Sequence, residues 1–109
     1  MTGFRGVTTS CYRRKKLYER MIEQKLAARV RAMGGIAPKF TSPGFDGMPD
    51  RLVLLPGGRM SFVELKAPGK KPRALQLARH RLLQRLGFNV YVIDEINQID
   101  SVLEEIDHE

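Results

Sequence analysis

The residues with the clearest chemical potential are Asp50, Glu64 and Lys66, which lie at the ends of two short apolar stretches. Asp50 precedes the first stretch, and Glu64 and Lys66 lie near the end of the second. Because side chains alternate faces along a strand, Glu64 and Lys66 point to the same side. Two carboxylates gathered with an amine are costly unless something binds there. A hard divalent cation held by oxygen ligands is the natural occupant.

The two apolar stretches form a predicted β-hairpin, with strands near residues 51–55 and 60–66 joined by a Pro-Gly-Gly turn. The length of the loop decides whether the two acids share a face. A loop of two or four residues would pair Arg51 with Glu64 and send Asp50 and Glu64 to opposite sides. A shared metal site therefore predicts an odd loop, a bulge at the glycines, or Asp50 held outside the regular ladder.

A helix is predicted over residues 17–33, ended by a pair of glycines. Its apolar residues recur at spacings of three and four and form one stripe: Ile22, Leu26, Val30 and Met33. Glu19 and Glu23 lie one turn apart at the edge of this stripe, from which an acid can reach a site at the margin of the core. For either acid alone, a solvated carboxylate in contact with a base one turn away is the simpler interpretation.

A short strand is predicted over residues 36–41, followed by a loop rich in proline and glycine over residues 42–47. Such a loop lets backbone approach a ligand closely. Lys39, Ser42 and the loop amides are candidate phosphate contacts, and a plain connecting loop is nearly as good an interpretation.

A second helix is predicted from Pro72 to about Leu86. Its predicted buried stripe consists of Leu75, Ala78, Leu82 and Leu86. Gln76 lies one turn into this helix, near the strand end that carries Lys66, and could hydrogen-bond a metal-bound water or a phosphate. From the residues alone, an ordinary surface glutamine is the simpler interpretation. His80, one turn further on, is interpreted as a surface or packing residue rather than a ligand.

The remaining elements are a third strand over residues 88–93 and a last helix from about residue 97. The helix between the second and third strands acts as a crossover, so these strands are predicted to be parallel. The order of elements indicates an α/β domain with a mixed sheet. No site is expected in the acidic C-terminal helix and tail, residues 97–109.

The 109 residues carry a net charge of +7, distributed unevenly. The first 93 residues hold 19 basic and 5 acidic groups, and the last 16 hold 7 acids and no base. A body this basic suits nucleic acid. Residues 1–16 are expected to be a basic flexible arm that lies along phosphates or is simply a disordered tail. The single cysteine, Cys11, excludes an internal disulfide and favours a reducing cytoplasm, and there is no apolar run of the roughly 20 residues needed for a membrane span.

The pair of motifs Pro49-Asp50 and Glu64-Leu65-Lys66 resembles the PD-(D/E)-x-K nuclease signature. Two acids and a lysine at loose spacing also arise by chance, but the context is more specific. Across roughly residues 17–93 the chain resembles the VRR-NUC (virus-type replication-repair nuclease) family, in particular its short stand-alone bacterial and phage members. The matching segments are Gly34-Gly35, Lys39-Phe40-Thr41-Ser42-Pro43-Gly44, Gly47-Met48-Pro49-Asp50-Arg51, the Pro56-Gly57-Gly58 turn, Phe62-Val63-Glu64-Leu65-Lys66-Ala67-Pro68-Gly69, Gln76 and Gly87-Phe88.

This resemblance implies a restriction-endonuclease-like αβββαβ core, with a mixed sheet flanked by helices, over residues 17–109. It also implies cleavage of phosphodiester bonds with Mg²⁺ or Mn²⁺. Asp50 and Glu64 match the metal-binding acids of the family, and Lys66 matches its motif lysine. Gln76 matches the glutamine of the following helix. The acid of the first helix matches Glu23 best, with Glu19 as the alternative.

On this basis the metal is expected to be held by Asp50, Glu64 and the backbone carbonyl of Leu65, with Glu23 binding it through water or holding a second ion. The expected DNA contacts are Lys39, Ser42, Arg51, Lys70, Lys71 and Arg73. Short family members are thought to act as homodimers on branched DNA such as Holliday junctions, in a bacterial cell or a phage-infected host. A less selective nicking or flap endonuclease is the alternative, and an inactive nucleic-acid-binding module or a protein-binding adaptor on the same fold are the alternatives from other classes.

Overall fold

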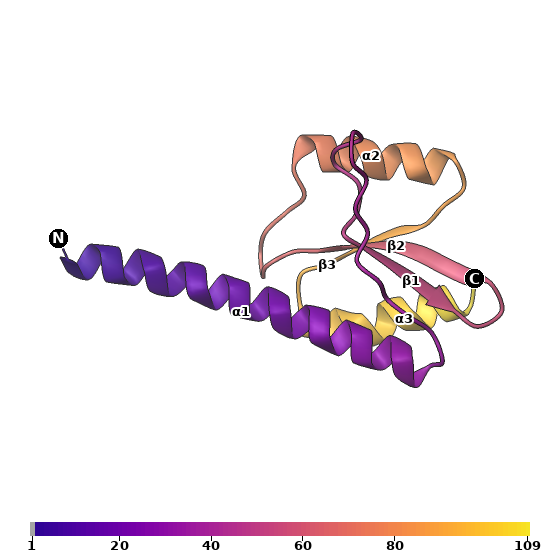
Figure 1. Cartoon of the computed structure of the whole chain (residues 1–109), viewed down its shortest axis with the longest axis horizontal. Helices are drawn as coiled ribbons and strands as arrows, with labels where there is room; N and C mark the ends of the chain where they lie inside the picture. The colour runs from indigo at the N-terminus through magenta and orange to yellow at the C-terminus, as the bar shows by residue number, and fades with distance from the viewer. Residues whose placement is uncertain (1) are drawn as a thin grey trace.

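The computed structural model describes the backbone of residues 2–109 and the side chains of residues 13, 14 and 16–109. Its elements, shown in Figure 1, are α1 (Thr2–Ala32), β1 (Arg51–Leu55), β2 (Arg59–Leu65), α2 (Ala74–Arg85), β3 (Val90–Ile93), the 3₁₀ turn η1 (Ile96–Gln98) and α3 (Ile99–Asp107). No helix in the described part of the chain combines the length and the apolar character needed to cross a membrane.

The three strands form one mixed sheet in the order β1-β2-β3. β1 and β2 are antiparallel, and β2 and β3 are parallel, as the crossover through α2 predicts. α1 and α3 lie on one side of the sheet and α2 lies on the other (Figure 1). The predicted α/β architecture, with a mixed sheet flanked by helices, is therefore confirmed.

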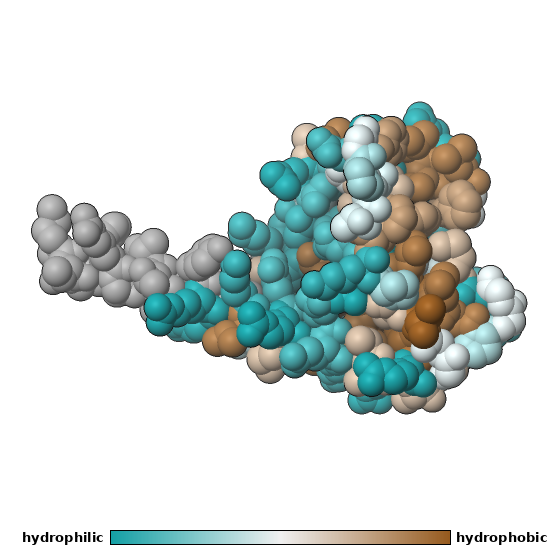
Figure 2. All heavy atoms as spheres, viewed as in Figure 1, coloured by the Kyte–Doolittle hydropathy of each residue, from teal (hydrophilic) through white to brown (hydrophobic). Residues whose placement is uncertain are grey.

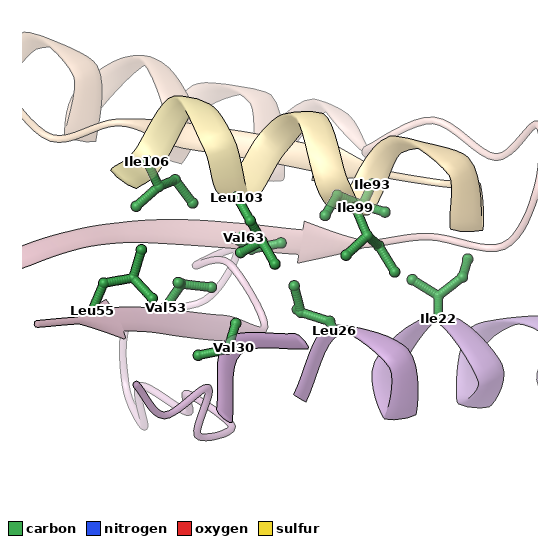
Figure 3. Packing of buried hydrophobic residues seen from close by; sticks show 10 residues of the cluster. All are labelled: Ile22, Leu26, Val30, Val53, Leu55, Val63, Ile93, Ile99, Leu103 and Ile106. Carbon is green, nitrogen blue, oxygen red and sulfur yellow. The ribbon is translucent and has the colours of Figure 1, made fainter. Parts of the chain in front are cut away.

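The hydrophobic core lies between the sheet and the helices α1 and α3. Its buried members, drawn in Figure 3, are Ile22, Leu26, Val30, Val53, Leu55, Val63, Ile93, Ile99, Leu103 and Ile106. Val53 and Leu55 lie two apart on β1, so they share the face that the predicted stripe of α1 covers. None of these core residues comes from α2. The helix α2 therefore contributes no side chain to this hydrophobic core.

The first helix is longer than the sequence predicts. α1 begins at Thr2 rather than Leu17, so residues 2–16 of the expected irregular arm are helical, and residue 1 lies outside the described residues. Arginine, lysine and leucine are good helix formers, and the basic run at residues 13–17 contains no proline or glycine that would end a helix. Figure 1 shows the N-terminal half of α1 extending beyond the sheet.

The strand expected over residues 36–41 is reduced to two isolated antiparallel bridges, Ile36 with Leu54 and Lys39 with Arg51. The segment still follows the outer edge of β1, since the Leu52 amide donates to the Pro38 carbonyl at 3.1 Å. Pro38 has no N–H to return that hydrogen bond, so the ladder is interrupted at this residue. The predicted first strand of the core is thus a bridged segment in this chain.

The second helix turns a different face inward from the one predicted. The buried residues of α2 are Gln76, His80 and Leu83, whereas Leu75 and Leu86 are 46% and 63% exposed. Apolar surface also lies over α2 in Figure 2. Two polar side chains on a buried helix face require polar partners on the opposing sheet.

Candidate functional site

The turn of the hairpin sets the geometry of the site. Leu55 pairs with Arg59, so the loop between them has the odd length that a shared site requires. Arg51 pairs with Val63, and continuing this register by one residue places Asp50 opposite Glu64. Asp50 lies just outside β1, and its Oδ2 accepts a hydrogen bond from the Leu65 amide at 3.1 Å. The predicted odd loop is confirmed.

Glu64 is fully buried, at 0% exposure, on the face of the sheet that α2 covers. Gln76 donates from Nε2 to Glu64 Oε2 at 3.3 Å, and Lys66 Nζ lies 3.9 Å from the same oxygen. His80 Nε2 lies 3.5 Å from the other oxygen, Oε1. The polar inner face of α2 is explained by this carboxyl group, because a buried polar group, charged or neutral, requires hydrogen-bonding partners.

The electrostatics of the site are dominated by the closeness of its two acids. Burial, a hydrogen bond with Asp50 and the charge of Asp50 raise the pKa of Glu64 to about 8, while the charges of Lys66 and Arg73 act in the opposite direction. Burial and the charge of Lys66 lower the pKa of His80, against a smaller opposing effect of Asp50. At neutral pH the two carboxyl groups therefore retain a proton between them, and a divalent cation would replace it with a larger compensating charge.

The donor atoms present fit a hard cation with few protein ligands. Asp50 and Glu64 offer carboxylate oxygens on one face, and Mg²⁺ is commonly bound by one or two carboxylates, completing its shell with waters and substrate phosphate. Among the residues with described side chains, no three or more His, Cys, Asp or Glu residues form a group that could hold a metal. The arrangement suits Mg²⁺ or Mn²⁺ bound together with substrate rather than an ion enclosed by protein.

Glu23 lies in a different cluster from the one expected. Its carboxylate forms ion pairs with Arg51 and with Lys39, the latter at 3.5 Å. Arg51 follows Asp50 along β1, so it points to the opposite face of the sheet, toward α1. Glu19, the alternative, is partly buried one turn earlier on α1. The structure thus brings Asp50, Glu64, Lys66 and Gln76 together and places Glu23 with Arg51 instead.

The residues expected to contact DNA divide into two groups. Arg51 is 8% exposed, and its guanidinium donates to Glu23 and to the Ala37 carbonyl, the latter at 2.7 Å, so it is occupied within the fold. Ser42 is partly buried, and its carbonyl accepts from the Phe45 amide at the start of a turn. The remaining basic side chains are exposed: Lys39, Lys70, Lys71 and Arg73. Of these, Arg73 lies near enough to the site for its charge to lower the pKa of Glu64.

A hollow of about 450 Å³ opens beside Gln76, lined by Asp46, Gly47, Met48, Arg73, Leu75 and Gln76. The loop that forms one wall is held against α2 by Arg79. Its Nε donates to the Asp46 carbonyl at 2.8 Å, and its guanidinium lies 3.9 Å from the centre of the Phe45 ring. Gly47 adopts a φ of +89°, and a Cβ there would lie 2.8 Å from Leu75 Cγ, so only glycine fits this approach.

Two residues of this site were not singled out from the sequence. His80 was interpreted as a surface or packing residue, although its spacing of four from Gln76 places both on one face of a helix. That spacing was the available signal. Arg79 had no comparable signal, because its partners in the 42–47 loop lie more than thirty residues earlier in the chain.

Both the sequence and the fold are similar to those of known proteins. No family model matches the sequence. The chain is 52% identical over 85 residues to "Putative nuclease p44" of Acyrthosiphon pisum secondary endosymbiont phage 1, covering 78% of this chain and 90% of that protein. It is also similar to a solved structure described as "VRR_NUC domain", with 35% identity and a TM-score of 0.75 over 80% of this chain and 95% of that one. At this level of identity and coverage, the chain belongs to the VRR-NUC domain family.

Proposed function

We propose that this protein is a divalent-metal-dependent DNA endonuclease. Its active site for hydrolysis of phosphodiester bonds would be formed by Asp50, Glu64 and Lys66. The observation that carries the proposal is the position of Asp50 opposite Glu64, with Lys66 Nζ 3.9 Å from the Glu64 carboxylate. Membership of the VRR-NUC family and the nuclease name of the phage relative support the same reaction class.

Each residue has a distinct role in this proposal. Asp50 and Glu64 would hold the cation, together with the Leu65 carbonyl. A divalent cation bound there supplies Lewis acidity and a lowered pKa of water. Lys66 places a compact positive charge beside the reacting phosphate, which orients the nucleophile and offsets the developing negative charge. Gln76 holds the Glu64 carboxylate in place.

In this proposal Glu23 is a structural partner of Arg51 rather than a metal ligand. Its ion pairs with Arg51 and Lys39 occupy the carboxylate on the α1 side of the sheet. Glu23 therefore fixes Arg51, which in turn anchors the start of β1 one residue after Asp50.

We further propose that DNA lies across the exposed basic residues Lys39, Lys70, Lys71 and Arg73, with one strand passing the hollow beside Gln76. Phosphate contacts from lysine and arginine give affinity that depends on salt and is blind to sequence. Branched DNA and a homodimer are the finer parts of the proposal, based on resemblance to the short family members. A two-fold dimer presents two equivalent sites, which the paired cutting of a four-way junction requires.

A cleavage assay tests this function. Wild type, Lys66→Ala and the control Arg85→Ala, on the exposed face of α2, would be compared on a labelled four-way junction, a flap and plain duplex, each with Mg²⁺, Mn²⁺ or EDTA. Paired cuts on the junction, dependent on metal and on Lys66, are expected. Cutting of all three substrates would instead indicate a less selective nuclease. Binding without cutting in Mg²⁺ or Mn²⁺ would overturn the nuclease proposal in favour of a binding module.

A further inference from the structure

The inner face of α2 carries two buried polar side chains where an amphipathic helix would carry apolar ones. Gln76 and His80 are 8% and 6% exposed, while the leucines beside Gln76 in the sequence, Leu75 and Leu77, face solvent at 46% and 40%. Leucines that face solvent lose the favourable free energy of apolar burial. The arrangement is accounted for only if the polar face of α2 meets something on the sheet that needs it.

That partner is the carboxylate of Glu64. Gln76 contacts Oε2 at 3.3 Å, and His80 Nε2 contacts Oε1 at 3.5 Å. The amide of Gln76 has a fixed orientation, because its Oε1 accepts from the Arg73 backbone N–H at 2.8 Å and its Nε2 is left for Glu64. Each oxygen of Glu64 therefore has its own partner from α2, one helical turn apart.

We propose that His80 is a positioning residue, whose Nε2–H donates to Glu64 Oε1 and fixes the carboxylate for binding a divalent cation together with Asp50. This inference rests on the proposed function. A glutamate side chain has three rotatable bonds, and Gln76 and Lys66 both contact the same oxygen, Oε2, so these two contacts leave the carboxylate able to turn about that oxygen. A contact on the other oxygen removes this freedom, and such outer contacts commonly contribute 10- to 100-fold to metal affinity.

The alternative is that His80 merely fills space beneath α2. Packing depends on volume and not on which ring nitrogen carries the proton. A pair of substitutions separates the two roles, since the amide nitrogen of glutamine is as many bonds from Cα as Nε2 of histidine, whereas that of asparagine is one bond closer. His80→Gln can keep the contact to Glu64 Oε1, and His80→Asn cannot.

The test is the affinity of the intact protein for Mn²⁺, measured by calorimetry without DNA, for wild type, His80→Gln, His80→Asn and the control His108→Asn on the exposed C-terminal histidine. We expect His80→Asn to weaken Mn²⁺ binding about 10- to 100-fold, with His80→Gln and the control within about threefold of wild type. Equal affinities in all four proteins would overturn the role of His80 and leave the proposed function intact. Absence of Mn²⁺ binding by wild type, both without DNA and in the presence of an uncleavable DNA duplex, would overturn both.

The contact between His80 and Glu64 can also be tested on the wild-type protein, without any substitution that affects folding. Long-range ¹H–¹⁵N NMR of the Mg²⁺-loaded protein reports which nitrogen of His80 is protonated. The proposal requires the proton on Nε2. A proton on Nδ1 alone would leave a lone pair facing the carboxylate oxygen, and would overturn the proposal.

Discussion

Asp50 lies opposite Glu64 because Arg51 pairs with Val63, one residue further into the hairpin. A register shift of one residue would separate the two carboxylates onto opposite faces of the sheet. The three-residue turn of Pro56, Gly57 and Gly58 therefore determines the site as much as the acids themselves. Gly57 and Gly58 both adopt positive φ, at 88° and 77°, as the turn requires.

A substitution at Asp50 can separate an effect on cleavage from an effect on DNA affinity. Asp50→Asn keeps the side-chain shape and the acceptor for the Leu65 amide but removes one of the two negative charges that would hold the cation. We expect cleavage to fall by more than about 100-fold, since the loss removes a metal ligand rather than an outer contact. DNA affinity measured in EDTA should stay near the wild-type value. An equal loss of binding and cleavage would indicate a structural role for Asp50.

The ion pair of Glu23 with Arg51 predicts a stability effect without an effect on metal binding. Glu23→Gln leaves the guanidinium of Arg51, which is only 10% exposed at its side chain, without its carboxylate. Because Glu23 itself is 34% exposed, we expect the free energy of unfolding to fall by about 1–3 kcal/mol, less than for a fully buried pair. Chemical denaturation measures this change. A large loss of Mn²⁺ affinity in Glu23→Gln would contradict the assignment and restore Glu23 as a ligand.

The raised pKa of Glu64 predicts how the stability of the metal-free protein depends on pH. The pKa rises from 4.5 to about 8 on folding, so the folded state holds an extra proton between these values. The contribution of Glu64 to the free energy of unfolding is therefore fully present below pH 4.5 and is lost as the pH rises toward 8. His80 has the opposite effect, mainly below its ordinary pKa of 6.5. This opposing effect is at half its maximum at that pH and fades about one pH unit above it, where Glu64 dominates the pH dependence.

Denaturation in EDTA between pH 6.5 and 8 measures this effect. We expect the free energy of unfolding of wild type to decrease with pH, with a slope of at most about 1.4 kcal/mol per pH unit for one proton. Glu64→Gln cannot ionise, so its curve should be flatter over this range. Parallel curves for the two proteins would show that Glu64 does not hold the proton.

The close approach of Gly47 to α2 predicts a difference between two glycines of one loop. Gly47→Ala would place a Cβ 2.8 Å from Leu75 Cγ and 3.2 Å from the Leu75 carbonyl, whereas Gly44, at a similar φ of +80°, has open space around it. Both substitutions incur the left-handed backbone cost of about 1–2 kcal/mol. Gly47→Ala should add about 1–3 kcal/mol of overpacking. Thermal unfolding of the two variants measures the difference, and equal losses would show that the loop is not packed against α2.

The sequence by itself determined the features that depend on neighbours along the chain. Period-two alternation places Glu64 and Lys66 on one face, and the Pro-Gly-Gly turn indicates a hairpin. The requirement that Asp50 and Glu64 share a face was enough to predict a hairpin loop of odd length, which the register confirms. The helix between two buried strands predicted their parallel pairing, because the handed crossover leaves few alternatives.

The tertiary structure alone decided which faces of the helices turn inward. The spacing of apolar residues placed Leu75 and Leu86 on the buried face of α2. The structure instead places Gln76 and His80 on that face, because the buried carboxyl group of Glu64 lies opposite. The position of Glu64 opposite α2 follows from tertiary packing. The placement of Glu23 depends in the same way on how α1 is rotated against the sheet, which brings it to Arg51 rather than to Asp50. Contacts between residues far apart in the chain depend on three-dimensional packing, which local periodicity does not encode.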